Sequence, residues 1–245
     1  MLIVRVLRAE LLKLKRTLAF RMIFVAPLIV ATLQFFVIWR SPQINARFKL
    51  WETLPRNSLS VWAVFLMPLM ITLETALLSG IEHNDHQWKH ILALPVPRHL
   101  VYFTKFIAAQ ALIASSTLIL CVLTVLVGLV APYLRPELVH SGPVPWAWIA
   151  RHATMVWLAA WLIIAIHTWV AVRWSAFTVA VSVGMSGTFF AIFASGAKVA
   201  KYYPWLLPVN VFTDDRINVA LWLGALGGVA AAVAGCLEFV RRDVA

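Results

Sequence analysis

Charged residues are scarce in this chain of 245 residues. Aspartate, glutamate, lysine and arginine together make up 13% of the sequence, whereas hydrophobic residues make up 62%. A soluble domain is usually ~25% charged and ~45–50% apolar. The composition therefore excludes an ordinary water-soluble globule, and the high apolar share also excludes an intrinsically disordered chain.

Cysteine ligands and phosphate-binding loops are also missing. The only two cysteines, Cys121 and Cys236, lie in apolar runs, and neither belongs to a CxxC or Cys/His pattern, so no disulfide framework or zinc site is indicated. The sequence contains no Gly-Lys pair, which excludes a GxxxxGK[ST] nucleotide-binding loop. His83, His86 and His90 have ligand spacing, but histidines at the end of a span are more typical of a surface, and we predict no metal site.

What the sequence does contain is long apolar runs. About 20 apolar residues in a helix cross the hydrocarbon layer of a bilayer. Six runs approach this length, and tryptophans and prolines flank several of them as expected at membrane interfaces. We therefore predict an all-α integral membrane protein with a single transmembrane domain over residues 1–245 and spans at 22–39, 59–79, 106–131, 153–172, 177–196 and 217–237.

The first twenty residues have an amphipathic pattern. A hydrophobic residue recurs every three or four positions, at Ile3, Leu7, Leu11, Leu14 and Leu18. Basic residues occupy the opposite side of the predicted helix, which is typical of a helix lying in the membrane surface. Residues 1–20 are therefore predicted to form an amphipathic interface helix, either a membrane anchor or also a contact for a cytoplasmic partner. The basic residues before the first span favour cytoplasmic N- and C-termini.

The stretch between the second and third predicted spans, residues 81–105, changes character twice. It is polar at first, apolar from Ile91 to Leu94, and then interrupted by Pro95 and Pro97. Residues that precede a proline avoid helical geometry. The pattern predicts a short helix, a rigid corner and a second helix that leads into the third span.

Three features resemble one known family. They are the amphipathic run from Leu7 to Arg16, the run from Trp88 to Arg98 followed by Tyr102 and Lys105, and the six-span layout with a long outer connection before the last span. Together they resemble the permease subunit of ABC-2 type ATP-binding-cassette exporters. Within that family the chain is most similar to the small permeases of antibiotic-resistance and lantibiotic-immunity transporters, although Pro97 stands where many relatives carry serine.

The resemblance implies roles for particular residues. A cytoplasmic coupling helix between spans two and three would dock on a separate ATPase subunit and would include Glu82, Trp88, Lys89, Pro95, Pro97, Arg98 and Lys105. The interface helix would contribute Arg8, Glu10, Lys13, Lys15 and Arg16. Residues 197–216, which are too apolar for a free loop, would form an outer re-entrant segment between spans five and six.

The resemblance also implies partners and a location. This chain would bind no cofactor itself, and ATP and Mg²⁺ would sit on the partner ATPase subunit. The other partners would be a second permease, in a homo- or heterodimer, and membrane lipid. The expected location is the bacterial plasma (inner) membrane, as a multi-pass protein.

Two ionisable residues fall inside the predicted spans. Glu74 is the one acid and His167 the one histidine there, and such groups within a membrane are expensive and are often functional. Two interpretations stay open: a hydrogen bond between helices, or a polar lining of a translocation path.

Two glycine patterns indicate close helix packing. Gly184-Met185-Ser186-Gly187 matches the GxSG of intramembrane serine proteases, but no histidine follows it in a later span, so packing is favoured. Gly224 and Gly228 form a GxxxG pattern, which predicts close contact within the fold or across a dimer.

The sequence therefore predicts a transport subunit that is not itself an enzyme and exports an amphipathic peptide, antibiotic or lipid-like molecule. The alternatives are an integral-membrane enzyme, either a protease or a lipid-modifying protein, and a transporter driven by an ion gradient. The net charge of +11 implies no nucleic-acid partner, because its largest cluster lies in the interfacial N-terminal helix.

Overall fold

The computed structural model describes residues 7, 13, 17–41, 49–80, 96–138 and 142–241 in full, and the backbone of residues 81–84. All regular structure in this part of the chain is helical. Five helices are long and apolar enough to cross a membrane, and a bent pair of shorter helices provides a sixth crossing if it is counted as one span. This agrees with the predicted all-α membrane architecture.

The second predicted span is longer than expected. It consists of α3 (Leu50–Val61), a π-helix η1 (Trp62–Leu66) and α4 (Met67–Asn84), of which Leu50–Gly80 forms one apolar helix. The prediction began at residue 59 because residues 50–58 carry polar groups. The π-helix ends two residues before Pro68. In a regular helix the proline ring clashes with the carbonyl group four residues earlier, and the wider turn accommodates it.

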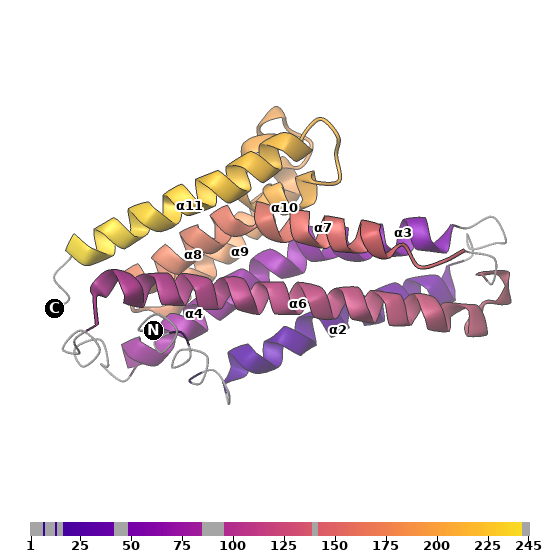
Figure 1. The fold of residues 1–245 in the computed structure, drawn as a ribbon, viewed down its shortest axis with the longest axis horizontal. Coiled ribbons are helices and arrows are strands. Elements are labelled where there is room, and N and C mark those ends of the chain that lie inside the picture. The colour runs from indigo at the N-terminus through magenta and orange to yellow at the C-terminus, as the bar shows by residue number, and fades with distance from the viewer. Residues whose placement is uncertain are drawn as a thin grey trace.

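The first and third spans also extend beyond the predicted limits. α2 covers Leu18–Arg40, and α6 covers Arg98–Leu134, against predictions of 22–39 and 106–131. At 1.5 Å per residue, the 37 residues of α6 span ~55 Å, which exceeds a hydrocarbon layer of ~30 Å. α6 is therefore longer than a single crossing requires, and it runs along the long axis of the bundle (Figure 1).

The fourth predicted span, 153–172, is not one straight helix. It is divided at Ala160 into α7 (Trp146–Ala159) and α8 (Trp161–Arg173), which are bent by 40°. No proline lies at the break. The sequence of this segment alone therefore gave no indication of the bend at Ala160.

The remaining chain forms α9 (Phe177–Ala194), a series of short helices and α11 (Ile217–Arg241). The short helices are η3 (Lys198–Tyr202), η4 (Pro204–Leu206) and α10 (Leu207–Asn210). Trp205, Leu206 and Leu207 are buried, which agrees with the prediction that this connection is not a free loop.

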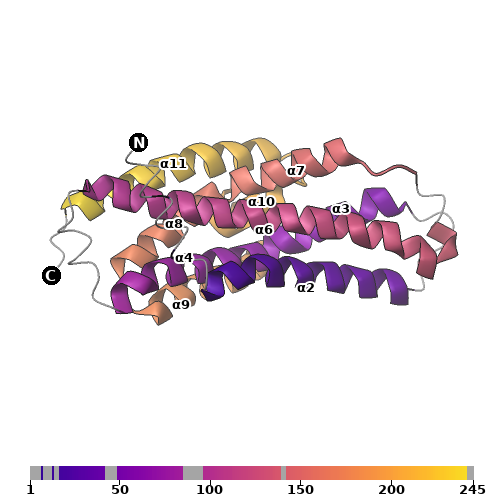
Figure 2. The same cartoon turned by 60° about the horizontal axis from the view of Figure 1, so that its bottom comes forward.

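α4 is the central helix of the bundle. In the apolar window of Leu50–Gly80, 61% of residues are buried, against 28–39% in the other four candidate spans. α4 packs against α2, α6, α8 and α9, while α11 covers α8, α6 and α7 (Figure 2). As a consequence, the buried side chains of strongest polarity lie on α4 or on helices that pack against it.

The GxxxG pattern of α11 lies against the break in the fourth span. A Cβ atom on Gly224 would be 2.4 Å from Cα of Ala159, and one on Gly228 would be 2.6 Å from the carbonyl carbon of Trp161. Both contacts are with backbone atoms on either side of Ala160. The close contact predicted from the pattern is thus made within the fold, where it supports the bent pair.

We expect Gly228→Ala to lower the free energy of unfolding by about 1–3 kcal/mol, because the added methyl group overlaps backbone atoms that cannot rotate away. Thermal unfolding of the purified protein measures the change. Gly227→Ala is the matched control, since its methyl group would meet only flexible side chains, that of Leu223 at 3.3 Å and that of Leu162 at 3.7 Å. Equal stability of the two variants would contradict this packing.

Candidate functional site

One end of the bundle contains the candidate coupling residues that the structure describes. α4 and α11 end there and α6 begins there, at the left of Figure 1, and we call it the Arg98 end. Several predicted coupling and interface residues lie outside the described residues, namely Arg8, Glu10, Lys15, Arg16, Trp88, Lys89 and Pro95, as does the side chain of Glu82. Lys13 is described and is half-buried.

Pro97 and Arg98 start α6. Pro97 is exposed, has extended backbone angles (φ −57°, ψ 132°) and precedes the first helical residue, as expected for a proline that sets a helix start. Its carbonyl oxygen accepts a hydrogen bond of 2.9 Å from the backbone N–H of Leu100. Arg98 Nη1 donates to the carbonyl oxygen of Val240 at 3.4 Å, so the start of α6 contacts the end of α11.

Lys105 lies inside the bundle. Its side chain is 1% exposed, and its Nζ donates a hydrogen bond of 3.1 Å to the carbonyl oxygen of Leu78 on α4. A buried ammonium group requires such oxygen partners. Lys105 therefore joins the end of α4 to the start of α6, the two helices that flank the predicted coupling segment.

Glu238 forms a second connection at the Arg98 end, which the sequence reasoning missed. Its carboxylate accepts a hydrogen bond from Trp169 Nε1, and its Oε1 lies 3.1 Å from Arg173 Nε. Trp169 and Arg173 belong to α8 and Glu238 to α11. The signal in the sequence was an acidic residue near the end of an otherwise uncharged last span.

Tyr102 adds an aromatic contact between α6 and α11. It is 1% exposed, its ring lies 5.9 Å from that of Phe239, and its hydroxyl group occupies the space where Gly235 lacks a side chain. The Arg98 end is therefore bonded across four helices: Lys105 joins α6 to α4, Arg98 and Tyr102 join α6 to α11, and Glu238 joins α11 to α8.

Glu74 is completely buried on α4, one helical turn before Leu78. Neither of its carboxylate oxygens has a hydrogen-bond partner among the described residues. An unpartnered carboxyl group in a membrane interior is energetically unfavourable, so Glu74 remains a candidate for a functional position.

His167 on α8 is also completely buried, and it has partners. Its Nε2 lies 3.5 Å from Oγ1 of Thr72, and its ring meets that of Trp205 edge to face, with centroids 5.6 Å apart. Thr72 uses its single hydroxyl proton to bond the carbonyl oxygen of Pro68 at 2.8 Å. The hydrogen bond to Thr72 therefore requires the proton on Nε2 of His167.

Glu74 and His167 do not face each other. His167 contacts Thr72, and Glu74 follows Thr72 by two residues, which corresponds to a rotation of ~200° around the helix. The two residues thus lie on opposite sides of α4, and both are 0% exposed. In this conformation they do not line a common open path, and the contacts of His167 fit the hydrogen-bonding interpretation.

Residues 197–216 are anchored to the bundle by specific bonds. The Tyr203 hydroxyl group donates to the carbonyl oxygen of Gly187 at 3.0 Å, and its ring stacks on Trp205. The Tyr203 phenol is protonated at neutral pH, and partial burial raises its pKa further. A Cβ atom on Gly187 would overlap the Trp205 ring, and one on Gly184 would overlap Thr72. These contacts support packing, not catalysis, for the GxSG pattern, whose Ser186 is exposed.

Three basic residues at the opposite end bind carbonyl oxygens of the backbone. Arg135 donates to Trp39 and Ser41 at the end of α2, Arg216 to Ser195 after α9, and Arg56 to Phe212. The last carbonyl groups of a helix have no partner within the helix and carry its negative dipole end, so cations stabilise them. These arginines thus have a structural role.

Within the described residues, no group of three or more His, Cys, Asp and Glu side chains is placed to hold a metal ion. The side chains of His83, His86 and His90 lie outside the described part of the chain.

The fold defines a multi-pass helical membrane protein. A family model described as "ABC-2 family transporter protein" matches residues 6–193, and the chain belongs to this family. The family consists of membrane transport components that are not themselves catalytic. The match extends from the amphipathic N-terminal region through α9. No curated protein matches the chain.

We expect Lys105→Met to lower the free energy of unfolding by about 1–2 kcal/mol, because a hydrogen bond from a charged donor is lost. Hydrogen exchange should accelerate at the end of α4 and the start of α6, where the bond lies. Lys198→Met, at an exposed position, is the control. Unchanged exchange at both helix ends in Lys105→Met would show that this bond does not hold them together.

Proposed function

We propose that the chain is the transmembrane permease subunit of an ATP-driven exporter, with a separate ATPase subunit docking at the Arg98 end. The family match supports the transport role. ABC-2 permeases normally work with an ATPase subunit, which supports the proposed partner. In this proposal both termini and the Arg98 end face the cytoplasm of a bacterium, and two permeases form a homo- or heterodimer in the inner membrane.

The single observation that carries the mechanism is the bonding at the Arg98 end. Residues 85–95 connect α4 to α6, and Lys105 holds these two helices together directly. Arg98 extends the connection to α11, and Glu238 extends it to α8. A force applied to the connecting segment when the ATPases close would therefore act on four helices at once, not on one flexible loop.

The cargo in this proposal is an amphipathic peptide, an antibiotic or a lipid-like molecule, as in the antibiotic-resistance and lantibiotic-immunity permeases that the sequence resembles. It would leave the cytoplasm or the inner leaflet between two permeases. Glu74 is the candidate polar residue of the path, and it would become accessible only after α4 moves relative to its neighbours. Residues 197–216 would form the outer re-entrant segment, held by Tyr203 and Trp205.

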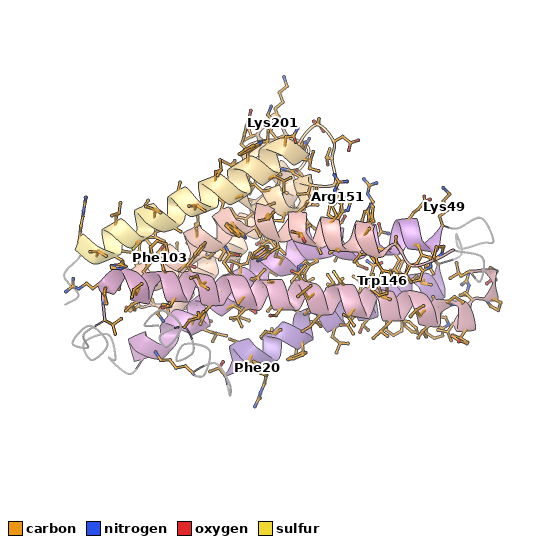
Figure 3. The ribbon with its side chains drawn as sticks, viewed as in Figure 1. Phe20, Lys49, Phe103, Trp146, Arg151 and Lys201 are labelled. Carbon is orange, nitrogen blue, oxygen red and sulfur yellow. The ribbon has the colours of Figure 1, made fainter. Side chains whose placement is uncertain are left out.

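The coupling role is tested by co-purification with the ATPase subunit encoded beside this chain. We expect Trp88→Ala and Arg98→Ala each to reduce the retained ATPase about tenfold, since truncating a central interface residue removes ~1–2 kcal/mol of binding. Arg151→Ala is the control, because Arg151 is exposed and points away from the bundle (Figure 3). Full ATPase retention by both Trp88→Ala and Arg98→Ala would contradict docking at this end.

The role of Glu74 is tested by Glu74→Gln, which keeps the size and polarity of the side chain but cannot ionise. We expect transport into inverted vesicles to fall several-fold while the protein level and ATPase binding stay normal. Glu137→Gln, at an exposed glutamate of the opposite end, should leave transport unchanged. Normal transport by Glu74→Gln would leave Glu74 with a structural role alone.

A further inference from the structure

A groove separates α6 from α7 on the outer surface of the bundle. Its volume is about 440 Å³, and it extends along α7 from Trp146 to Trp157. Its α6 wall includes Leu118 and Val122, which are 64% and 58% exposed. Trp146, which is 63% exposed, lies at one end of the groove. Figure 3 shows Trp146 between the two helices. In a membrane, side chains exposed in this way face lipid.

The threonine hydroxyl groups and the Trp157 indole N–H in the walls of the groove are already bonded within the protein. Thr117 Oγ1 accepts from Trp62 Nε1 at 3.1 Å and donates to Ile113. Thr154 donates to Ala150, and Trp157 Nε1 donates to the carbonyl oxygen of Gln110 at 3.3 Å. A polar occupant would therefore lose its own hydrogen bonds without gaining new ones. The walls of the groove therefore favour an occupant made of hydrocarbon.

The width of the groove selects among apolar occupants. Trp146 and Trp157 are 11 residues apart, or ~17 Å along a helix, so 440 Å³ corresponds to a mean cross-section of ~26 Å². A helix with side chains is ~10–12 Å across and needs ~80–110 Å². A methylene chain, whose neighbours approach to ~4 Å, needs roughly 20 Å². A single hydrocarbon chain fits along the groove, whereas a transmembrane helix is too wide to lie within it and could only cover its opening.

We propose that the groove between α6 and α7 is a binding site for one acyl chain of a bilayer phospholipid. The groove is open to the bilayer at Leu118 and Val122, where phospholipid is the abundant source of such chains. Trp146 stands at the end of the groove where α7 begins, and an indole ring at headgroup level marks the place where the chain enters. This site is independent of the transport function proposed above.

Photo-crosslinking tests the site directly. The full chain is reconstituted in phosphatidylcholine vesicles that contain a minor fraction of phosphatidylcholine with a diazirine in one acyl chain. After illumination, peptide mass spectrometry locates the adducts. We expect adducts concentrated on the groove walls, and Ala150→Phe, which fills the groove from α7, should reduce them at least fivefold. Adducts spread evenly over all exposed helices would overturn the proposal.

Matched variants make the result specific. Ala147 is an exposed alanine one turn from Ala150 that does not line the groove, so Ala147→Phe should leave the adduct yield unchanged. Ala114→Phe fills the same groove from α6 and decides the question if Ala150→Phe does not fold. Unchanged yield in a folded groove-filling variant would overturn the site. So would efficient oxidative crosslinking of two chains through Cys121, which lines the groove, because a second copy would then cover it.

Discussion

Helix backbones approach each other closely at small residues, and this packing fixes the arrangement of the bundle. Lipid is as apolar as a leucine side chain, so the hydrophobic effect does not drive helices together within a membrane, and close van der Waals packing must do so. Gly224 and Gly228 bring α11 onto the backbone on both sides of Ala160. This contact holds the bent fourth span in place, and the bend positions α8, which carries His167, Trp169 and Arg173, against α4 and α11.

Electrostatic contacts add specificity to this packed frame. At the Arg98 end, Lys105 and Glu238 join four helices through buried or half-buried bonds. At the opposite end, Arg56, Arg135 and Arg216 bind backbone carbonyl oxygens, two of them at or just beyond the ends of α2 and α9. Part of the net charge of +11 therefore serves to stabilise backbone carbonyl groups, two of them near helix ends.

The helical membrane architecture could be predicted because it depends on local composition. A backbone in lipid must satisfy its own hydrogen bonds, so each long apolar run has to be a helix, and its presence is visible in the sequence. Helix limits were less predictable: α6 and α3 continue through polar residues that a count of apolar residues excludes. The partner of the GxxxG pattern, the break at Ala160 and the bond of Lys105 depend on residues far apart in the chain.

Composition and pattern were enough to identify a multi-pass helical membrane protein, and the amphipathic N-terminal run and the segment around Pro95 and Pro97 resembled those of ABC-2 permeases. The tertiary structure alone decided how the charged residues are used. It placed Lys105 inside the bundle and Glu74 and His167 on opposite sides of α4. The reason is physical: burial and hydrogen bonding in a membrane depend on which helices pack together, and a single helix sequence does not specify its neighbours.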